Sequence, residues 1–148
     1  MRFAGYAALF DRRDRGGDVI AQGAFADSLK QRTGDGQVIP ILWQHDPGQQ
    51  IGTIEHVAED ARGLRVIGRL WERGGAPATA AALLRKGAVD GLSFGYRVVA
   101  ARPGAGSARR LERLDIVEVS LVTHPMQPGA RVHALEAGGE SRSGTPGP

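Results

Sequence analysis

Short runs of apolar residues, each ended by glycine or by charged residues, recur along most of the chain. Runs of this length that are rich in Val, Ile and Leu predict β-strands. They fall at residues 3–10, 19–20, 37–43, 51–57, 64–71, 93–101 and 111–123. The last run predicts either one long strand or two broken ones. The charged residues and glycine between the fourth and fifth runs predict a hairpin.

Two other segments show the spacing of amphipathic helices. Residues 24–31 place Phe25 and Leu29 on one helical face. Residues 77–86 are rich in Ala and Leu, begin with a proline and are followed by Gly87, which is typical of a helix end. Together these patterns predict a mainly β fold of the α+β class. We expect a small closed or partly open β-barrel of six to seven strands with about two packed helices.

The composition changes at residue 137, after which the chain consists mostly of Gly, Ser, Pro and other small or polar residues. Such a segment buries too little apolar surface to offset the entropy lost on ordering. We therefore predict one domain over residues 1–136 and a disordered tail over residues 137–148. The tail is expected to be dispensable for folding.

Composition and charge exclude several classes of function. The chain has no cysteine, which excludes disulfides, thiolate zinc sites and a cysteine nucleophile. Its four histidines lack the spacing of metal ligands, so we expect neither a metal nor another cofactor. The 19 basic residues are interspersed with 16 acidic ones, which argues against nucleic-acid binding. With no apolar run of membrane-spanning length and no signal-peptide pattern, we expect a cytosolic chain without a membrane partner.

Three residues that could form a nucleophilic hydrolase site stand at the ends or edges of predicted strands. Ser93 lies between Gly91 and Gly95, His45 follows an apolar run and precedes the turn-forming residues 46–48, and Glu118 interrupts another apolar run. A serine, a histidine and an acid are the parts of such a site. Their order along the chain differs from the three orders of the common hydrolase folds.

Each of these residues also has a plainer interpretation. His45 alone fits a loop histidine, Ser93 fits a β-turn serine between glycines, and Glu118 fits a surface glutamate paired with an arginine. Period-two alternation places Glu118 on one strand face with Ser120. A helix precedes Ser93 and a strand follows it, so the strand–turn–helix setting of α/β-hydrolases is missing. An unrelated small esterase is therefore disfavoured.

Taken in order, five motifs resemble the prohead maturation proteases of tailed bacteriophages. They are GDVI…GAF at residues 17–25, HD…IG at 45–52, GL at 63–64, GLSFGY at 91–96 and EVSLVT…P at 118–125. The resemblance covers about residues 3 to 133. It implies a fold like that of the herpesvirus assemblin proteases, with a Ser-His core completed by a third residue on a later strand, the place that Glu118 occupies.

The resemblance implies a serine endopeptidase inside a procapsid in the cytoplasm. Its expected partner and substrate is the scaffolding segment of the major capsid protein precursor, and its own tail is a second candidate substrate. Ser93 would be the nucleophile, His45 the general base and then acid, and Glu118 the residue that orients the imidazole. Homodimerisation is left open. The short chain also suits a compact version from a gene transfer agent.

One departure from the assemblin pattern concerns the oxyanion hole. Those proteases use an arginine-bearing segment soon after the third residue, whereas residues 124–128 here contain no arginine and the first is Arg131. Backbone amides near Ser93 or Gly95 are the candidate donors. The alternative function is a non-enzymatic capsid-assembly or scaffold-like β-barrel module with a decayed site.

Overall fold

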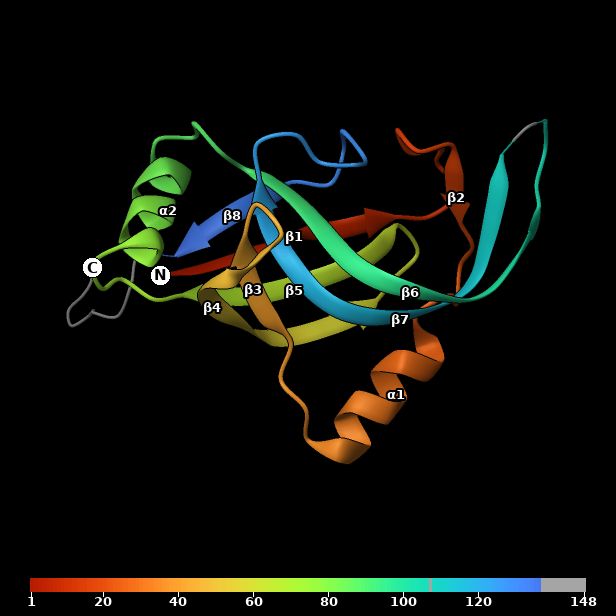
Figure 1. Cartoon of the computed structure of the whole chain (residues 1–148), viewed down its shortest axis with the longest axis horizontal. Helices are drawn as coiled ribbons and strands as arrows, with labels where there is room; N and C mark the ends of the chain where they lie inside the picture. The colour runs from red at the N-terminus through yellow and green to blue at the C-terminus, as the bar shows by residue number, and fades with distance from the viewer. Residues whose placement is uncertain (107, 137–148) are drawn as a thin grey trace.

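The computed structural model describes residues 1–106 and 108–136, and Figure 1 shows how its elements are arranged. These ranges contain eight strands and two helices. In chain order they are β1 (Arg2–Leu9), β2 (Asp18–Ile20), α1 (Ala26–Asp35), β3 (Pro40–Trp43), β4 (Asp46–Glu59), β5 (Gly63–Leu70), α2 (Ala76–Arg85), β6 (Gly91–Pro103), β7 (Arg109–Val122) and β8 (Val132–Glu136). The predicted tail, residues 137–148, lies outside the described residues.

All eight strands join one sheet, and β7 is its central connection. The order is β2-β7-β3-β4-β5-β1-β8, with β6 pairing to β7. Strand β6 runs antiparallel along one edge of β7, while β2 and β3 pair in parallel with the beginning and the end of the other edge. The end of β3 and the start of β6 therefore lie on opposite sides of the same part of β7.

The sheet confirms the mainly β, α+β class and the two helices but corrects the number of strands. The structure has eight strands, not six to seven. The strand pairing does not close into a barrel among the described residues, because only an isolated bridge between Gly91 and Arg131 links β6 to the segment that leads into β8. The unpredicted strand is β8, whose last four residues are exposed and so show no apolar alternation.

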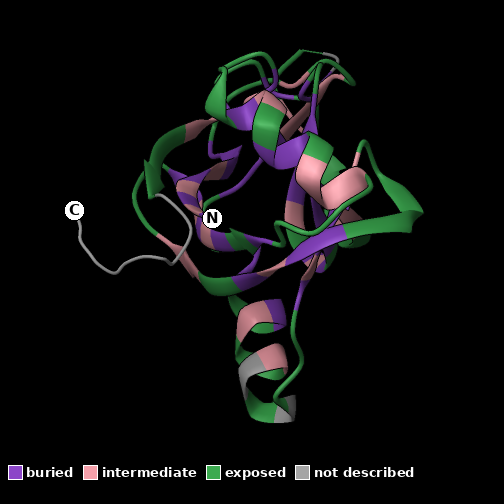
Figure 2. Ribbon diagram, turned by 90° about the vertical axis from the view of Figure 1, so that its left-hand side faces the viewer, coloured by how far each residue is buried: buried purple, intermediate pink, exposed green. Residues whose placement is uncertain are grey.

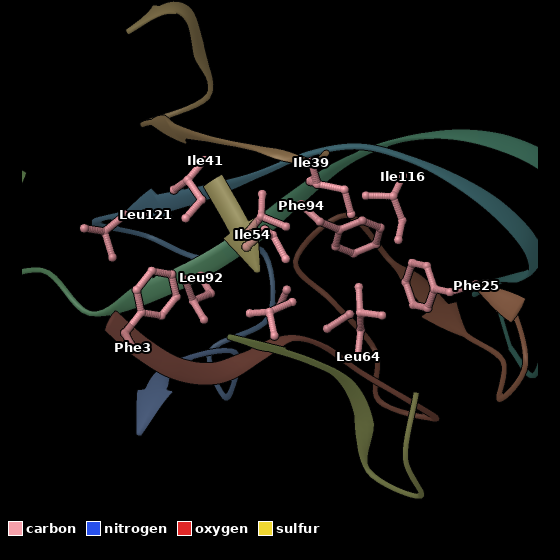
Figure 3. Close-up of a cluster of buried hydrophobic side chains, with 14 of the residues drawn as sticks. Phe3, Phe25, Ile39, Ile41, Ile54, Leu64, Leu92, Phe94, Ile116 and Leu121 are labelled. Carbon is pink, nitrogen blue, oxygen red and sulfur yellow. The ribbon is translucent and has the colours of Figure 1, made fainter. Parts of the chain in front are cut away.

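The hydrophobic core lies on the inner face of the curved sheet. Figure 3 shows side chains from several strands converging there, among them Phe3, Ile41 and Leu92. Each large aliphatic or aromatic side chain removed from water stabilises the fold by about 1.5–3 kcal/mol. Helix α2 contributes Ala80, Ala81 and Leu84 to the buried set. Helix α1 instead projects from the body of the domain, with mostly exposed residues toward its far end (Figure 2).

Two local predictions are settled by the ladder of β7 and by the start of β4. Strand β7 is one long strand, because β6 pairs with it from Arg109 to Val122. The turn that the sequence predicts after His45, at residues 46–48, lies instead at Gln44 and His45, and β4 already begins at Asp46. The shift places His45 inside the turn rather than before it.

Candidate active site

His45 sits in the tight turn that joins β3 to β4. Trp43 and Asp46 pair across this hairpin, so Gln44 and His45 form a two-residue loop. Both have positive φ values, 51° and 62°, as type I′ hairpin turns require. Glycine and asparagine tolerate this conformation best, and for other residues it costs on the order of 1 kcal/mol each. Other interactions must therefore hold the turn in place.

Those interactions come from β7. The Gln44 N–H donates to the Leu121 carbonyl oxygen at 3.0 Å, and the His45 N–H donates to Ser120 Oγ at 3.1 Å. The Gln44 side-chain amide donates to Thr123 Oγ1 at 2.7 Å and accepts from the Thr123 N–H at 3.1 Å. The turn is thus fastened to the end of β7, which determines where the His45 ring lies.

The His45 ring is paired with Glu118 on the same strand. The distance from His45 Nδ1 is 2.7 Å to Glu118 Oε1 and 3.3 Å to Oε2. Glu118 is only 6% exposed, whereas the imidazole is 45% exposed. Glu118 is therefore not a surface glutamate paired with an arginine. A carboxylate that accepts from Nδ1–H leaves the lone pair of the neutral ring on Nε2.

This pairing shifts the proton affinity of the histidine. The hydrogen bond that the His45 ring donates to Glu118 raises the pKa of His45 above its ordinary value. The partial burial of the ring opposes this shift, and the negative charge of Glu118 adds to it. The imidazolium is thus stabilised where it forms, and the ring is a stronger base than a free histidine.

Ser93 lies in β6, directly opposite Ser120 of β7 in the antiparallel register. It is 7% exposed, and it lines with His45 one small pocket of about 80 Å³. Among the described residues no hydrogen bond joins Ser93 Oγ to the His45 ring, and such contacts are often loose in free enzymes. The structure thus brings the three sequence-predicted residues together: His45 and Glu118 by direct contact, Ser93 by the shared pocket.

Steric crowding explains why residues 91 and 95, on either side of Ser93, are glycines. Neither glycine is needed for a turn. The whole segment is strand β6, so Ser93 is not a β-turn serine. A Cβ at Gly95 would lie 2.7 Å from Glu118 Oε1, and one at Gly91 would lie 2.6 Å from the Val122 carbonyl oxygen. Gly95 therefore makes room for the carboxylate that contacts His45.

Ser120 is the site residue to which the sequence assigned no role. Its side chain has no exposed surface, and its Oγ donates to Glu118 Oε2 at 2.6 Å. The signal available from the sequence was the strand alternation that puts Ser120 on the same face as Glu118. Alternation does not show that the hydroxyl reaches both the carboxylate and the turn that carries His45.

Neither a metal cluster nor a spanning helix is found in the described part of the chain. No group of three or more His, Asp or Glu side chains there is placed to hold a metal ion. Within residues 1–106 and 108–136, neither helix is long and apolar enough to cross a membrane.

Comparison with known proteins places the chain in a family. The family model described as caudovirus prohead serine protease matches residues 1–142, nearly the whole chain. The chain belongs to the caudovirus prohead serine proteases. A curated relative in this family, the prohead protease of Enterobacteria phage HK97, is 29% identical over 140 residues. That match covers 91% of this chain but only 60% of the relative, so the chain spans about three fifths of the relative's length.

Solved structures extend the likeness to the fold. The bacteriophage T4 capsid assembly protease matches with a TM-score of 0.67 and 16% identity, over 82% of this chain and 80% of that one. The KSHV protease, solved with a hexapeptide phosphonate inhibitor, matches with a TM-score of 0.54 and 13% identity. That match covers 88% of this chain and 63% of the KSHV protease. At these identities the likeness shows a shared fold.

Proposed function

We propose that this chain is a serine endopeptidase that cleaves the scaffolding segment of a major capsid protein precursor inside a phage-type procapsid. Its catalytic residues are His45, Ser93 and Glu118. The observation that carries the proposal is the 2.7 Å contact between Glu118 and His45 Nδ1, beside the pocket that His45 shares with Ser93. A decayed assembly module would not need the positive φ of His45 or the hydrogen bonds that join His45, Glu118 and Ser120.

The arrangement supports acyl transfer through a covalent intermediate. Ser93 Oγ attacks the carbonyl carbon of the scissile bond while His45 Nε2 accepts its proton, and the protonated ring then donates that proton to the leaving amine. Water then attacks the acyl carbon while the neutral ring takes a proton from it. The protonated ring returns that proton to Ser93 Oγ as the ester bond breaks, and the acyl group leaves as a carboxylic acid that ionises in water. Glu118 holds the Nδ1–H tautomer and stabilises the imidazolium in both halves.

Ser93 is a better nucleophile candidate than Ser120, although both side chains lie on one face. Ser120 has no exposed surface, and its hydroxyl proton is directed at Glu118 Oε2. Ser93 lines the pocket, and no protein acceptor holds its hydroxyl among the described residues. Only Ser93 is thus open to a substrate carbonyl.

The oxyanion donors are proposed to come from the segment after β7. Met126 and Gln127 line the pocket of Ser93, and within the described residues their backbone N–H groups have no protein acceptor. The amide groups of Ser93 and Gly95 belong to the β6–β7 ladder. Arg131 does not line the pocket and pairs with Asp90 at 2.6 Å. Free N–H groups beside the nucleophile are suitable donors to a developing oxyanion.

The test of this function uses the purified chain and a candidate substrate, a major capsid protein precursor with a long N-terminal extension, to be sought among the products of the neighbouring genes. We expect discrete fragments that lack the scaffolding segment, and loss of cleavage when a peptidyl phosphonate is added. Mass spectrometry should place the phosphonate on Ser93. If the folded wild-type chain neither cleaves the precursor nor takes up the phosphonate, the proposal is contradicted. The origin in a phage or a gene transfer agent, and the removal of the tail by self-cleavage, stay predictions.

Gly95→Ala is expected to lower kcat/KM by about 100-fold. A displacement of about 1 Å of a group that positions the catalytic residues lowers the rate by that factor. The new methyl group would lie 2.7 Å from Glu118 Oε1 and push the carboxylate away from His45. Gly74→Ala is the matched control, since a Cβ there meets no atom within 4 Å. Equal kcat/KM values for the two variants would show that the Glu118 position does not matter.

The pH dependence should follow the proton on His45. Only the neutral ring accepts a proton from Ser93, so kcat/KM rises with pH through the pKa of His45, which lies above the ordinary 6.5. Glu118→Gln removes the main cause of that shift, so the acid limb moves to lower pH. The maximal rate falls on the order of 10⁴-fold, the loss known for an acid-to-amide change in such a triad. An acid limb at the same pH in both proteins would refute this assignment.

A further inference from the structure

Ser120 lies where the three strands that carry the site meet. In β7 it pairs with Leu42 of β3 on one side and with Ser93 of β6 on the other. Its hydroxyl makes two hydrogen bonds: it donates to Glu118 Oε2 at 2.6 Å and accepts from the His45 N–H at 3.1 Å. The single hydroxyl is thus bonded to both partners of the His45–Glu118 pair.

The bond to Glu118 restricts the carboxylate. Its Oε1 faces His45 Nδ1 at 2.7 Å and its Oε2 faces Ser120 Oγ at 2.6 Å, so rotation of the group would break both contacts. Hydrogen bonds from a hydroxyl to an ionised carboxylate are shorter and stronger than neutral ones. The carboxylate lies in the space that a side chain at residue 95 would occupy, since a Cβ at Gly95 would lie 2.7 Å from Oε1. Glu118 is therefore held in the one orientation that serves the imidazole.

The hydrogen bond between Ser120 Oγ and the His45 N–H stabilises the backbone conformation of the turn. His45 has a φ of 62°, and the N–H of this strained residue points at Ser120 Oγ rather than at a ladder partner. A half-buried N–H without an acceptor destabilises the fold, because it loses its hydrogen bond to water and gains none in return. The hydroxyl removes that cost only while the turn keeps its conformation.

We propose that Ser120 is a positioning residue of the proteolytic site, which holds the His45 turn and the Glu118 carboxylate in register through one buried hydroxyl. The inference rests on the proposed function for its kinetic consequence, but its structural content concerns His45 and Glu118 alone. Ser120 is fully buried and does not meet substrate, so it acts only through these two residues.

Ser28 provides a matched control for the loss of a buried hydroxyl. It lies in α1, is 4% exposed, and its Oγ accepts from the Ile116 N–H of β7 at 3.0 Å. Ser28→Ala therefore removes a buried serine hydroxyl that bonds to the backbone of β7 and has no hydrogen bond to His45 or Glu118 among the described residues. Any effect common to Ser28→Ala and Ser120→Ala reflects stability alone.

The experiment measures the His45 ring pKa by NMR titration in the wild type, Ser120→Ala, Ser120→Thr and Ser28→Ala, with His45→Ala to assign the signal. In Ser120→Ala we expect the pKa of His45 to fall toward its ordinary value, because the Glu118 contact that raises it becomes loose. The kcat value should fall about tenfold with KM unchanged, the loss expected for one hydrogen bond to a charged group. Ser120→Thr, which keeps the hydroxyl, and Ser28→Ala should match the wild type.

A Ser120→Ala protein with the wild-type pKa of His45 and wild-type kcat would overturn the inference. So would losses in Ser28→Ala equal to those in Ser120→Ala. If Ser120→Ala does not fold, Ser120→Cys replaces it, since cysteine fills nearly the same volume but is a weaker donor. The same lowered pKa of His45 and lowered kcat are then expected in Ser120→Cys. The titration needs no substrate, so a shifted pKa in a chain that cleaves nothing would support the role of Ser120 and refute the proposed function instead.

Discussion

We expect the replacement of Ser93 by alanine to abolish cleavage of the proposed capsid precursor and to leave the domain folded. The hydroxyl is the only group that can form the acyl intermediate, so kcat should fall on the order of 10⁶-fold, as it does when a serine nucleophile is removed. The fold should survive because Ser93 lies in the interior of β6, where alanine fits the strand and no protein hydrogen bond of the side chain is lost among the described residues. Precursor cleavage followed on gels, together with thermal unfolding, measures both effects.

Ser28→Ala is the control for this variant as well, since it removes another buried serine hydroxyl that does not line the pocket of Ser93. It should cleave at the wild-type rate. A Ser93→Ala protein that cleaves as fast as Ser28→Ala would show that Ser93 is only a strand residue. Ser120 would then be excluded as a substitute nucleophile by its complete burial, and the proteolytic reading of the site would fail.

Replacing His45 by alanine should be nearly as severe, with kcat reduced on the order of 10⁶-fold. Without the imidazole no base takes the proton of Ser93, and the free hydroxyl is a weak nucleophile. Because the two residues act as a unit, the double variant with Ser93→Ala should be no slower than either single variant. Initial rates over the same precursor concentrations measure all three proteins.

His56→Ala is the matched control for the histidine. His56 is exposed on β4, in the same hairpin as His45 but away from Glu118 and Ser93, so its loss should leave kcat unchanged. Rate losses that multiply in the double variant would contradict a shared catalytic unit. Wild-type activity in His45→Ala would remove the base from the mechanism.

Local patterns were enough for most of the strands and both helices. The predicted hairpin is the antiparallel pair β4–β5, and the Ala- and Leu-rich helix is α2, within one residue of its expected ends. These elements have clear signals because one face of each is buried and the residues between them favour turns. Strand β8 lacked such a signal, since it is an edge strand with most of its residues exposed.

The position of His45 shows where local patterns stop. An apolar run followed by Asp-Pro-Gly favours a turn after His45, yet the turn lies at Gln44 and His45, in a conformation that neither residue prefers. Contacts from β7 decide this, through Leu121, Ser120 and Thr123. Local propensity was overridden by hydrogen bonds to a strand that lies more than 70 residues away in sequence.

By itself the sequence predicted the presence of seven of the eight strands, the family resemblance and the three candidate residues His45, Ser93 and Glu118, because residue type and alternation are local properties. Only the tertiary structure decided that Gly95 makes room for a carboxylate and that Ser120 binds both members of the His45–Glu118 pair. Those roles depend on which strands lie beside β7 and in which register. Register and lateral order arise from packing between distant segments, which no local pattern along the chain encodes.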